Sequence, residues 1–352
     1  MDCVTIFSSR GAHTEQIHDF LAIVAEEVPN ADLLGPKKYV STSMSSRSRG
    51  ILKQVSVRAQ MSQSLLDAVP MVVQAITSSM SPTTPMQQIE SALRCFQAWM
   101  SILPTRYNEI ILACLSANVA SFSDLTPLIP MLISFLNPVE DHMFIAASDA
   151  LQEILSKSAL SDGSGSRTLT EPLLFWLDRI GTVIVQQAIS SGDTSLVARS
   201  TCKLIVALGD HSTSYLAANV ASRVVTTVNV PPSLQDPTIQ DQRAQIPKSH
   251  LVHSFLRLML AFTGLPGYFG VDEEESEMTL GFWYLFQEAL WTVDYHIDDT
   301  EGDVGQFAEP VASGDTKEKE QVRVAEAVYF ELVQILRRKV TFPPQGSGWG
   351  KG

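Results

Sequence analysis

Helical periodicity is the feature that most limits what this chain can fold into. Apolar residues recur three, four and seven positions apart, which places them on one face of a helix. Two clear stripes illustrate this: Ile17, Phe20, Leu21, Val24 and Val28, and then Met86, Ile89, Leu93, Phe96, Met100 and Leu103. We find no convincing alternation of period two, the pattern typical of a half-buried strand. The sequence therefore predicts an all-α protein.

Further helical runs follow one another along the chain, separated by polar joints rich in Ser, Gly and Pro. The serine-rich joint at 39–50 and the polar segment at 300–320 are the clearest of these joints. Helices of the same kind stand on both sides of each joint, so none reads as a linker between unlike domains. The predicted helices cover 52–77, 108–120, 125–136, 140–158, 171–190, 194–209, 213–225, 248–263, 277–293 and 318–340.

A faint internal repeat suggests how these helices are stacked. Four segments align so that Cys95, Ala150, Cys202 and Leu256 share one column, and Trp99, Ile154, Val206 and Leu260 share another. The column offsets are 150−95=55, 202−150=52 and 256−202=54 residues. Pairs of helices recurring at about 40–47 residues before insertions are typical of HEAT repeats. The fold we predict is an α-α superhelix, or solenoid, of HEAT-type repeats.

The predicted helix at 277–293 carries two apolar stripes. Phe282, Trp283, Phe286 and Leu290 form the first stripe, and Leu280, Tyr284 and Trp291 form the second. A helix with one buried side needs only one stripe. Two stripes predict a helix inside a stack, packed against its own partner and against the next repeat.

Composition excludes several classes of function. The 352 residues have a formal net charge of -13, which argues against nucleic acid and favours basic partners. The four cysteines are far apart and lack zinc-ligand spacing, so we expect reduced, buried thiols. The N-terminus lacks the features of a signal peptide, and the most apolar window, 125–136, is too short to cross a bilayer. We expect no membrane insertion.

A search for catalytic motifs finds none, and the prediction is that the chain is not an enzyme and holds no cofactor. The glycines of GLPGYFG lack the spacing of a dinucleotide loop and follow a helix instead of a strand. His250 and His253 share a helix face, but no carboxylate nearby completes a metal site. A helical enzyme is a further alternative, supported only by a few scattered histidines and carboxylates.

Two clusters of carboxylates bracket the helix at 277–293. They are Asp272, Glu273, Glu274, Glu275 and Glu277 before it, and Asp294, Asp298, Asp299, Glu301 and Asp303 after it. Neither has the spacing of a calcium loop. Glu275 and Glu277 suit the first turn of a helix, with Ser276 as its N-cap. That explanation leaves Asp272, Glu273 and Glu274, which with Asp298 and Asp299 are our candidate partner contacts.

Three segments resemble importin-β-type nuclear transport receptors, or karyopherins, especially the importin-thirteen and transportin-SR branch. They are RSTCKLIVALGDHSTSYL (199–216), LMLAFTGLPGYFGVDEEESEMTLGFWYLFQEAL (258–290) and VYFELVQILRRKVTFP (328–343). TGLPGYF followed by TLGFWY is the most specific piece. The likeness extends from about Val55 to Pro343 and suggests a central fragment, since such receptors are considerably longer. On this basis 1–50 is an N-terminal helix and joint, 51–342 a solenoid incomplete at both ends, and 343–352 a tail.

The resemblance implies a receptor that carries protein cargo through nuclear pores under the control of the GTPase Ran, without catalytic residues or cofactor. It implies cargo and Ran on the concave face, phenylalanine-glycine nucleoporins on the convex face, and shuttling between nucleus and cytoplasm. The family's N-terminal repeats make the main Ran contact, so that contact is expected of the full-length form. The alternative is a HEAT-repeat scaffold or regulatory subunit unrelated to Ran. The helix ending near Val340 should expose an apolar flank and limit solubility.

Overall fold

The computed structural model describes residues 13–30, 63–69, 71–80, 84–100, 102, 128–157, 166–191, 195–231, 234, 243–267, 275–291 and 314–340. The chain divides into two compact units. The first contains Met1–Leu132 and Asp149–Ala159, and the second contains Ile133–Ser148 and Leu160–Gly352. The predicted helix at 108–120 lies outside the described residues.

The first unit is built around two packed helices, α2 (Thr14–Asn30) and α4 (Met86–Met100). Residues 63–69 and 71–79 are also helical. The predicted apolar stripe of α4 is buried at Ile89, Leu93 and Phe96. Trp99 of α4 is buried, and its indole Nε1 donates a hydrogen bond of 2.9 Å to the backbone oxygen of Leu21. This bond gives the one polar atom of a large apolar side chain a partner, as burial requires.

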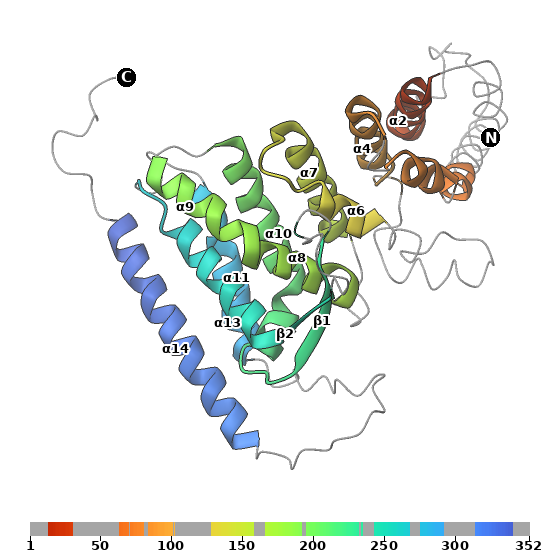
Figure 1. Cartoon of the computed structure of the whole chain (residues 1–352). Helices are drawn as coiled ribbons and strands as arrows, with labels where there is room; N and C mark the ends of the chain where they lie inside the picture. The colour runs from red at the N-terminus through yellow and green to blue at the C-terminus, as the bar shows by residue number, and fades with distance from the viewer. Residues whose placement is uncertain are drawn as a thin grey trace, which may run out of the picture. The chain divides into compact units, whose positions relative to one another are not determined.

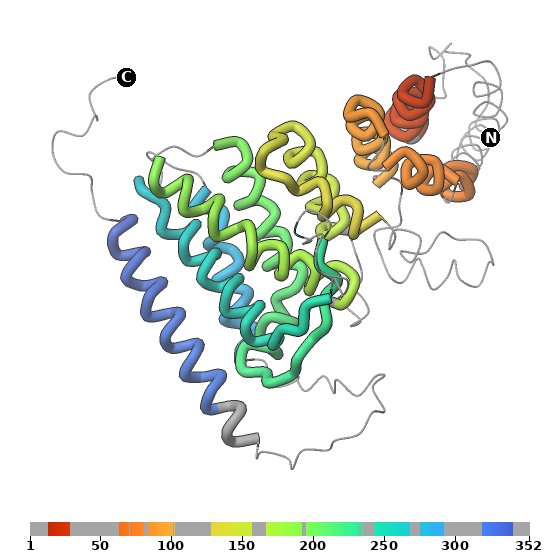
Figure 2. The backbone as a smooth tube through the Cα atoms, viewed as in Figure 1, coloured from red at the N-terminus to blue at the C-terminus, as the bar shows by residue number. Residues whose placement is uncertain are grey.

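The second unit stacks its helices in two layers. Figure 1 shows α9 (Thr182–Ser191), α11 (Lys248–Thr263) and α14 (Gly314–Lys339) side by side in one layer. In the other layer α10 (Leu196–Asn219) packs against α13 (Leu280–Trp291). The chain passes from one layer to the other at each successive long helix, as the tube in Figure 2 makes clear. This alternation is the helix-pair arrangement of a solenoid.

The layers correct the repeat alignment at its last step. Cys202 lies on α10 and Leu256 on α11, and both are buried. These two helices stand in different layers, so the column that joins them does not relate equivalent helices. The alignment matched them because any two buried amphipathic helices can be placed in partial register.

The helical segments before α11 largely follow the prediction. The helix predicted at 171–190 is present and begins earlier, at Ser166. The run Ser166–Ser191 is unbroken, formed by η2 (Ser166–Thr170), α8 (Glu171–Trp176), η3 (Leu177–Gly181) and α9. The helices predicted at 194–209 and 213–225 correspond to the two parts of α10, which meet at a kink where Ser212 has non-helical backbone angles; α10 ends at Asn219. The hydroxyl of Ser212 lies 2.9 Å from that of Thr170 in the neighbouring helical segment. This buried contact gives both hydroxyls a partner at the kink.

A two-stranded antiparallel ribbon connects α10 to α11, which the all-helical prediction missed. Strand β1 (Val225–Asn229) pairs with β2 (Arg243–Pro247), with Val225 opposite Pro247 and Asn229 opposite Arg243. Thr226, Val228 and Ile246 are buried, while their neighbours along the strands face outward. The period-two pattern is present but spans only five residues per strand, too few to stand out from the flanking polar sequence. The remaining described helices are α6 (Leu128–Ser134), α7 (Asp141–Lys157) and α12 (Glu275–Met278).

Candidate functional site

The motif TGLPGYF…TLGFWY forms a buried hydrogen-bonded joint between α11 and α13. The hydroxyls of Thr263 and Thr279 lie 2.8 Å apart, and both side chains are fully buried. The indole Nε1 of Trp283 donates to Thr263 Oγ1 at 3.0 Å. Thr263 and Thr279 also lie 2.7 Å from the backbone oxygens of Met259 and Ser276. The residues that make this motif distinctive therefore fix the angle at which the second helix leaves the turn.

The helix after this turn buries one face. Phe282 stacks on Phe286 with ring centroids 5.4 Å apart and meets Phe255 of α11 edge to face at 5.6 Å. On the second predicted stripe, Tyr284 and Trp291 are 64% and 65% exposed, and Leu280 is also at the surface. The prediction that this second stripe is buried is therefore wrong. Tyr284 instead donates a hydrogen bond to Glu288 one turn later, at 2.9 Å.

Two residues of α12, Glu275 and Ser276, are held by cations from two other helices. Glu275 is buried and forms an ion pair with the guanidinium Nε of Arg199 on α10. The thiol of Cys202, also on α10, donates to the backbone oxygen of Glu275 at 3.4 Å. Next to it, Ser276 Oγ accepts a hydrogen bond of 3.0 Å from Lys339 Nζ on α14. The short helix α12 is thus attached to both layers.

This geometry corrects one detail of the sequence interpretation. Helix α12 begins at Glu275, so Ser276 lies inside the helix and does not cap it. Glu275 and Glu277 do occupy the first turn, as predicted. The candidate partner contacts Asp272, Glu273, Glu274, Asp298 and Asp299 all lie outside the described residues. Their role stays a prediction.

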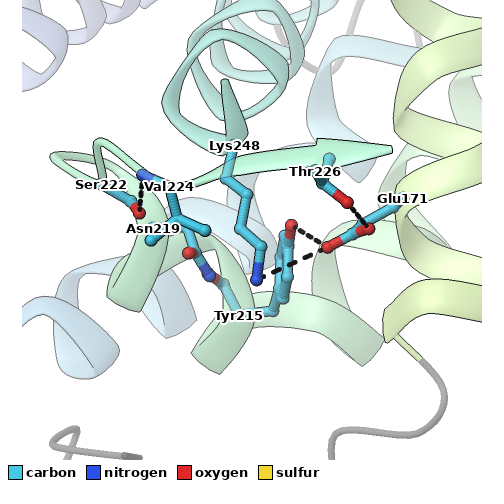
Figure 3. A network of polar contacts seen from close by, with 7 residues as sticks. All are labelled: Glu171, Tyr215, Asn219, Ser222, Val224, Thr226 and Lys248. Atoms are coloured by element: carbon cyan, nitrogen blue, oxygen red, sulfur yellow. Dashed lines mark hydrogen bonds and ion pairs between the residues drawn. The ribbon is translucent and has the colours of Figure 1, made fainter. Parts of the chain in front are cut away.

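A second buried carboxylate anchors the β-ribbon, as Figure 3 shows. Glu171 of α8 is almost fully buried and accepts hydrogen bonds from Tyr215 Oη, at 2.9 Å, and from Thr226 Oγ1 of β1. The Nζ atom of Lys248, the first residue of α11, lies 3.7 Å from Glu171 Oε1. A buried carboxylate is stable only when its oxygens have such partners. Glu171 therefore joins α8, α10, β1 and α11 at one point.

Sequence reasoning missed Arg199, Glu171 and Lys248 as members of these sites. Each pairs with a residue 44 to 77 positions away, as the separations 215−171=44, 275−199=76 and 248−171=77 show. Nothing local marks a charged helical residue as one half of a distant buried pair. The position of Glu171 one residue before Pro172 suggested only a helix start.

His250 and His253, the pair considered as a metal site, have different partners and do not form a common site. His250 Nε2 lies 3.3 Å from Asp178, whereas His253 Nε2 lies 2.8 Å from the backbone oxygen of Val220. Within the described residues no group of three or more His, Cys, Asp or Glu side chains is arranged to hold a metal ion. No described helix has the length and apolar character needed to cross a membrane.

The two-layered helix stack and the buried joints define the class of this protein as an α-α solenoid of HEAT type. Comparison with known proteins gives the particular likeness. The chain is 22% identical to importin-13 of Rattus norvegicus over 314 residues, which is 88% of this chain and 24% of that protein. It is 25% identical to importin-13 of Gallus gallus over 292 residues, or 82% of this chain and 22% of that protein.

The fold shows the same likeness. A solved structure of importin-13 in its cytosolic state superposes with a TM-score of 0.60 at 14% sequence identity. The match covers 98% of this chain and 33% of that structure. No family model matches the sequence. The predicted resemblance to the importin-β family and the predicted solenoid fold are confirmed. The chain spans about a quarter of the length of the relatives it matches.

Proposed function

We propose that this chain is part of a nuclear transport receptor and binds protein cargo on its helical surface. The observation that carries the proposal is the agreement of sequence and fold over the same residues: importin-13 matches most of the chain in both comparisons. The solenoid offers an extended binding surface of the kind that helical repeats use for proteins. On this proposal the chain carries out no chemistry.

The cargo we propose is basic. The net charge is -13, and the acidic block 272–274 directly precedes Glu275. Since Glu275 and Ser276 are tied to Arg199 and Lys339, the block extends from a point that is fixed in the stack. A cationic cargo segment would gain Coulomb energy and a faster encounter from such a group of carboxylates. Asp298 and Asp299, after α13, are proposed as a second part of the same surface.

We further propose that the full-length form binds Ran in its GTP-bound state and phenylalanine-glycine nucleoporins, and that it moves between nucleus and cytoplasm. Support comes from the similarity to importin-13 alone, because the chain spans only about a quarter of those relatives. These partners therefore belong to the whole protein.

Charge reversal tests the cargo proposal. The triple variant Asp272→Lys, Glu273→Lys and Glu274→Lys should weaken binding of a lysine-rich cargo peptide, measured by fluorescence anisotropy. Each exposed charge contributes about 0.2–1 kcal/mol, so the three together should cost about 0.6–3 kcal/mol, or roughly threefold to 150-fold in affinity. The matched control reverses three exposed carboxylates elsewhere: Glu140, Glu326 and Glu331. Equal losses in both variants would show only a general charge effect and would count against a specific acidic surface.

A pull-down with GTP-loaded Ran separates the transport reading from its alternative. The full-length gene product should retain Ran·GTP and release basic cargo when Ran·GTP is added. If it binds neither, a HEAT-repeat scaffold unrelated to Ran becomes the better description.

A further inference from the structure

The β-ribbon presents backbone groups that point away from its own pairing. In an antiparallel pair, residues alternate between those whose N–H and C=O groups face the partner strand and those whose groups face outward. Lys248 N donates to Val224 O at 2.9 Å, and these two residues extend the register of the ribbon by one pair. The alternation therefore turns the N–H and C=O groups of Val225, Thr227 and Asn229 away from β2.

The two edges of the ribbon are not equivalent. Pro247 of β2 occupies an outward-facing position opposite Val225, and proline has no N–H to donate. Strand β2 also packs against α11, into which it leads directly. On the outer edge of β1, Val225, Thr227 and Asn229 keep both backbone groups, and no described residue forms a hydrogen bond with them. The edge of β1 can therefore accept another strand.

Strand β1 is held in place before any partner binds. Its buried face meets α8, where Thr226 donates to Glu171, and Lys248 at the start of α11 contacts the same carboxylate (Figure 3). Both strands of the ribbon are thus fixed at their base on the stack of helices. A strand that is already ordered loses little conformational entropy when a partner pairs with it.

The exposed charges on the described part of the ribbon are cationic. Arg223, just before β1, and Arg243, at the start of β2, are exposed, and neither forms an ion pair with a described residue. Lys248 instead contacts a buried carboxylate. Residues 222–231 and 243–248 contain no carboxylate, while Asp236 and Asp241 of the connecting segment lie outside the described residues. A strand added to β1 would meet positive charge, although the net charge of the whole chain is -13.

We propose that the outer edge of β1 binds an extended, acidic segment of a partner protein as a third strand of the ribbon. Backbone hydrogen bonds to Val225, Thr227 and Asn229 hold the segment, and its carboxylates lie near Arg223 and Arg243. The edge selects an extended backbone, and the charges select acidic side chains. This partner is opposite in charge to the proposed cargo and uses none of the acidic residues proposed to bind it, so the two proposals fail independently.

A short labelled peptide is the probe for this edge. The peptide Gly-Thr-Glu-Val-Glu-Val-Glu-Thr-Gly, capped at both ends, should bind the 352-residue chain at low salt, as measured by fluorescence anisotropy. One control peptide carries Lys in place of each Glu. The other keeps the charges but is N-methylated at two adjacent central residues, which removes one donor from each of its edges. Both controls should bind at least about tenfold more weakly.

Amide exchange measured by NMR reports the geometry of the complex directly. The N–H groups of Val225, Thr227 and Asn229 should become protected when the acidic peptide is added. Those of Thr226 and Val228 face β2 and should be protected with or without the peptide. This alternating pattern is specific to a strand paired at the outer edge of β1.

Matched variants separate the two edges of the ribbon. Thr227→Pro removes an outward N–H from β1, and Gln245→Pro removes one from β2 at the position directly opposite. Thr227→Pro should lower peptide affinity about threefold to tenfold, and Gln245→Pro should leave it nearly unchanged. Melting temperatures of the two variants show whether both remain folded, and the peptide controls and amide exchange test the proposal in the unchanged chain if either does not.

A second pair of variants tests the charges. Arg223→Gln with Arg243→Gln should lower affinity about twofold to thirtyfold, since each exposed charge contributes modestly. The control, Arg257→Gln with Arg337→Gln, removes two exposed cations from α11 and α14 and should change affinity less.

Four results would overturn the proposal. The first is no binding of the acidic peptide at about 1 mM, and the second is equal binding of the N-methylated peptide. The third is equal protection, or none, at all five amides of β1. The fourth is self-association of the chain that Thr227→Pro abolishes without any peptide, which would assign the edge to a second copy.

Discussion

Gly209 of α10 lies directly against the ring of Phe282 in α13: a Cβ placed on Gly209 would be 2.6 Å from Phe282 Cδ2 and 3.3 Å from Met259 Cε of α11. Real Cβ atoms essentially never come within 3.0 Å of another heavy atom, so the 2.6 Å approach to Phe282 leaves no room for a side chain at Gly209. The absence of a side chain at this position lets two helices of one layer meet around a fully buried aromatic ring.

Gly209→Ala should therefore destabilise the second unit, although alanine favours helix more than glycine does. Overpacking of a core typically costs about 1–3 kcal/mol. The control is Gly281→Ala on α13, where nothing lies within 4 Å of the added Cβ. That change should raise stability by about 0.5–1 kcal/mol. Urea unfolding followed by circular dichroism measures both, and a stabilised Gly209→Ala would contradict the close packing.

Breaking the Arg199–Glu275 pair should cost more than removing both partners. Arg199→Met leaves the carboxylate of Glu275 buried without its cation, at a cost of about 1–3 kcal/mol. The double variant Arg199→Met with Glu275→Met should recover part of that loss. A double-mutant cycle on unfolding free energies gives the coupling between them. Strictly additive losses would mean that the pair contributes no coupling.

Removing one hydroxyl should loosen the β-ribbon without unfolding the helices. Thr226→Val keeps the side-chain shape but deletes the donor to Glu171, at a cost of about 1 kcal/mol. Amide hydrogen exchange should accelerate in residues 225–229 and 243–246 and stay unchanged in α13. Thr227→Val is the control, since the side chain of Thr227 is exposed on the same strand. Equal effects of both variants would indicate a loss of strand stability unrelated to Glu171.

His18 should make the first unit sensitive to acid. The imidazole is buried, its Nε2 lies 3.2 Å from Ser79 Oγ, and its Nδ1 has no hydrogen-bond partner among the described residues. Burial lowers the pKa of His18, while the charges of Asp19 and Glu15 act in the opposite direction. The unfolded chain therefore binds this proton more readily than the folded one.

Stability from His18 is therefore fully present above the ordinary histidine pKa, about 6.5, and falls as the pH drops toward the lowered folded value. Unfolding free energies measured between about pH 7.5 and about pH 5.5 should decline less in His18→Gln than in the unchanged protein. His142→Gln, at an exposed position on α7, should keep the original slope. Parallel slopes for all three proteins would rule out His18 as the source.

The apolar outer side of α14 should promote self-association. Phe330 is 70% exposed, and Val333 and Val340 are also at the surface, which confirms the predicted apolar flank. Light scattering should show concentration-dependent association that decreases in the variant Phe330→Ser with Val333→Ser. The melting temperature should change little, because neither side chain is buried. Unchanged scattering would mean that Phe330 and Val333 do not drive the self-association.

The helical part of the fold could be predicted because the spacing of apolar residues within one helix indicates which of its faces is buried. The stripe Ile89, Leu93 and Phe96 is read within one segment, and its burial follows from the period alone. The TGLPGYF…TLGFWY motif was also recognisable, and its Thr and Trp residues do form a joint. Gly264, Pro266 and Gly267 of the motif instead line a pocket against the end of α14, and the sequence alone does not predict that contact.

Relationships between helices could not be predicted in the same way. Cys202 and Leu256 are equally buried, yet they stand in opposite layers, because burial does not record which neighbour provides it. The same reason explains the error on the second stripe of α13: apolar character at Tyr284 and Trp291 predicts a covering helix, yet both side chains are exposed. The ion pair of Arg199 with Glu275 joins two residues that are 76 positions apart in the sequence, and no local pattern predicts it.

The β-ribbon lets the connection between α10 and α11 vary in length. Because β1 and β2 pair with each other and Glu171 holds their base, the two helices are joined by strands whose ends are already fixed. Chain added between Asn229 and Arg243 would lengthen a connection whose two ends are held together by the paired strands. Each doubling of the length of a flexible connection costs only about 0.6 kcal/mol. The ribbon is thus a place where evolution can insert new sequence into a stack of helices without shifting their register.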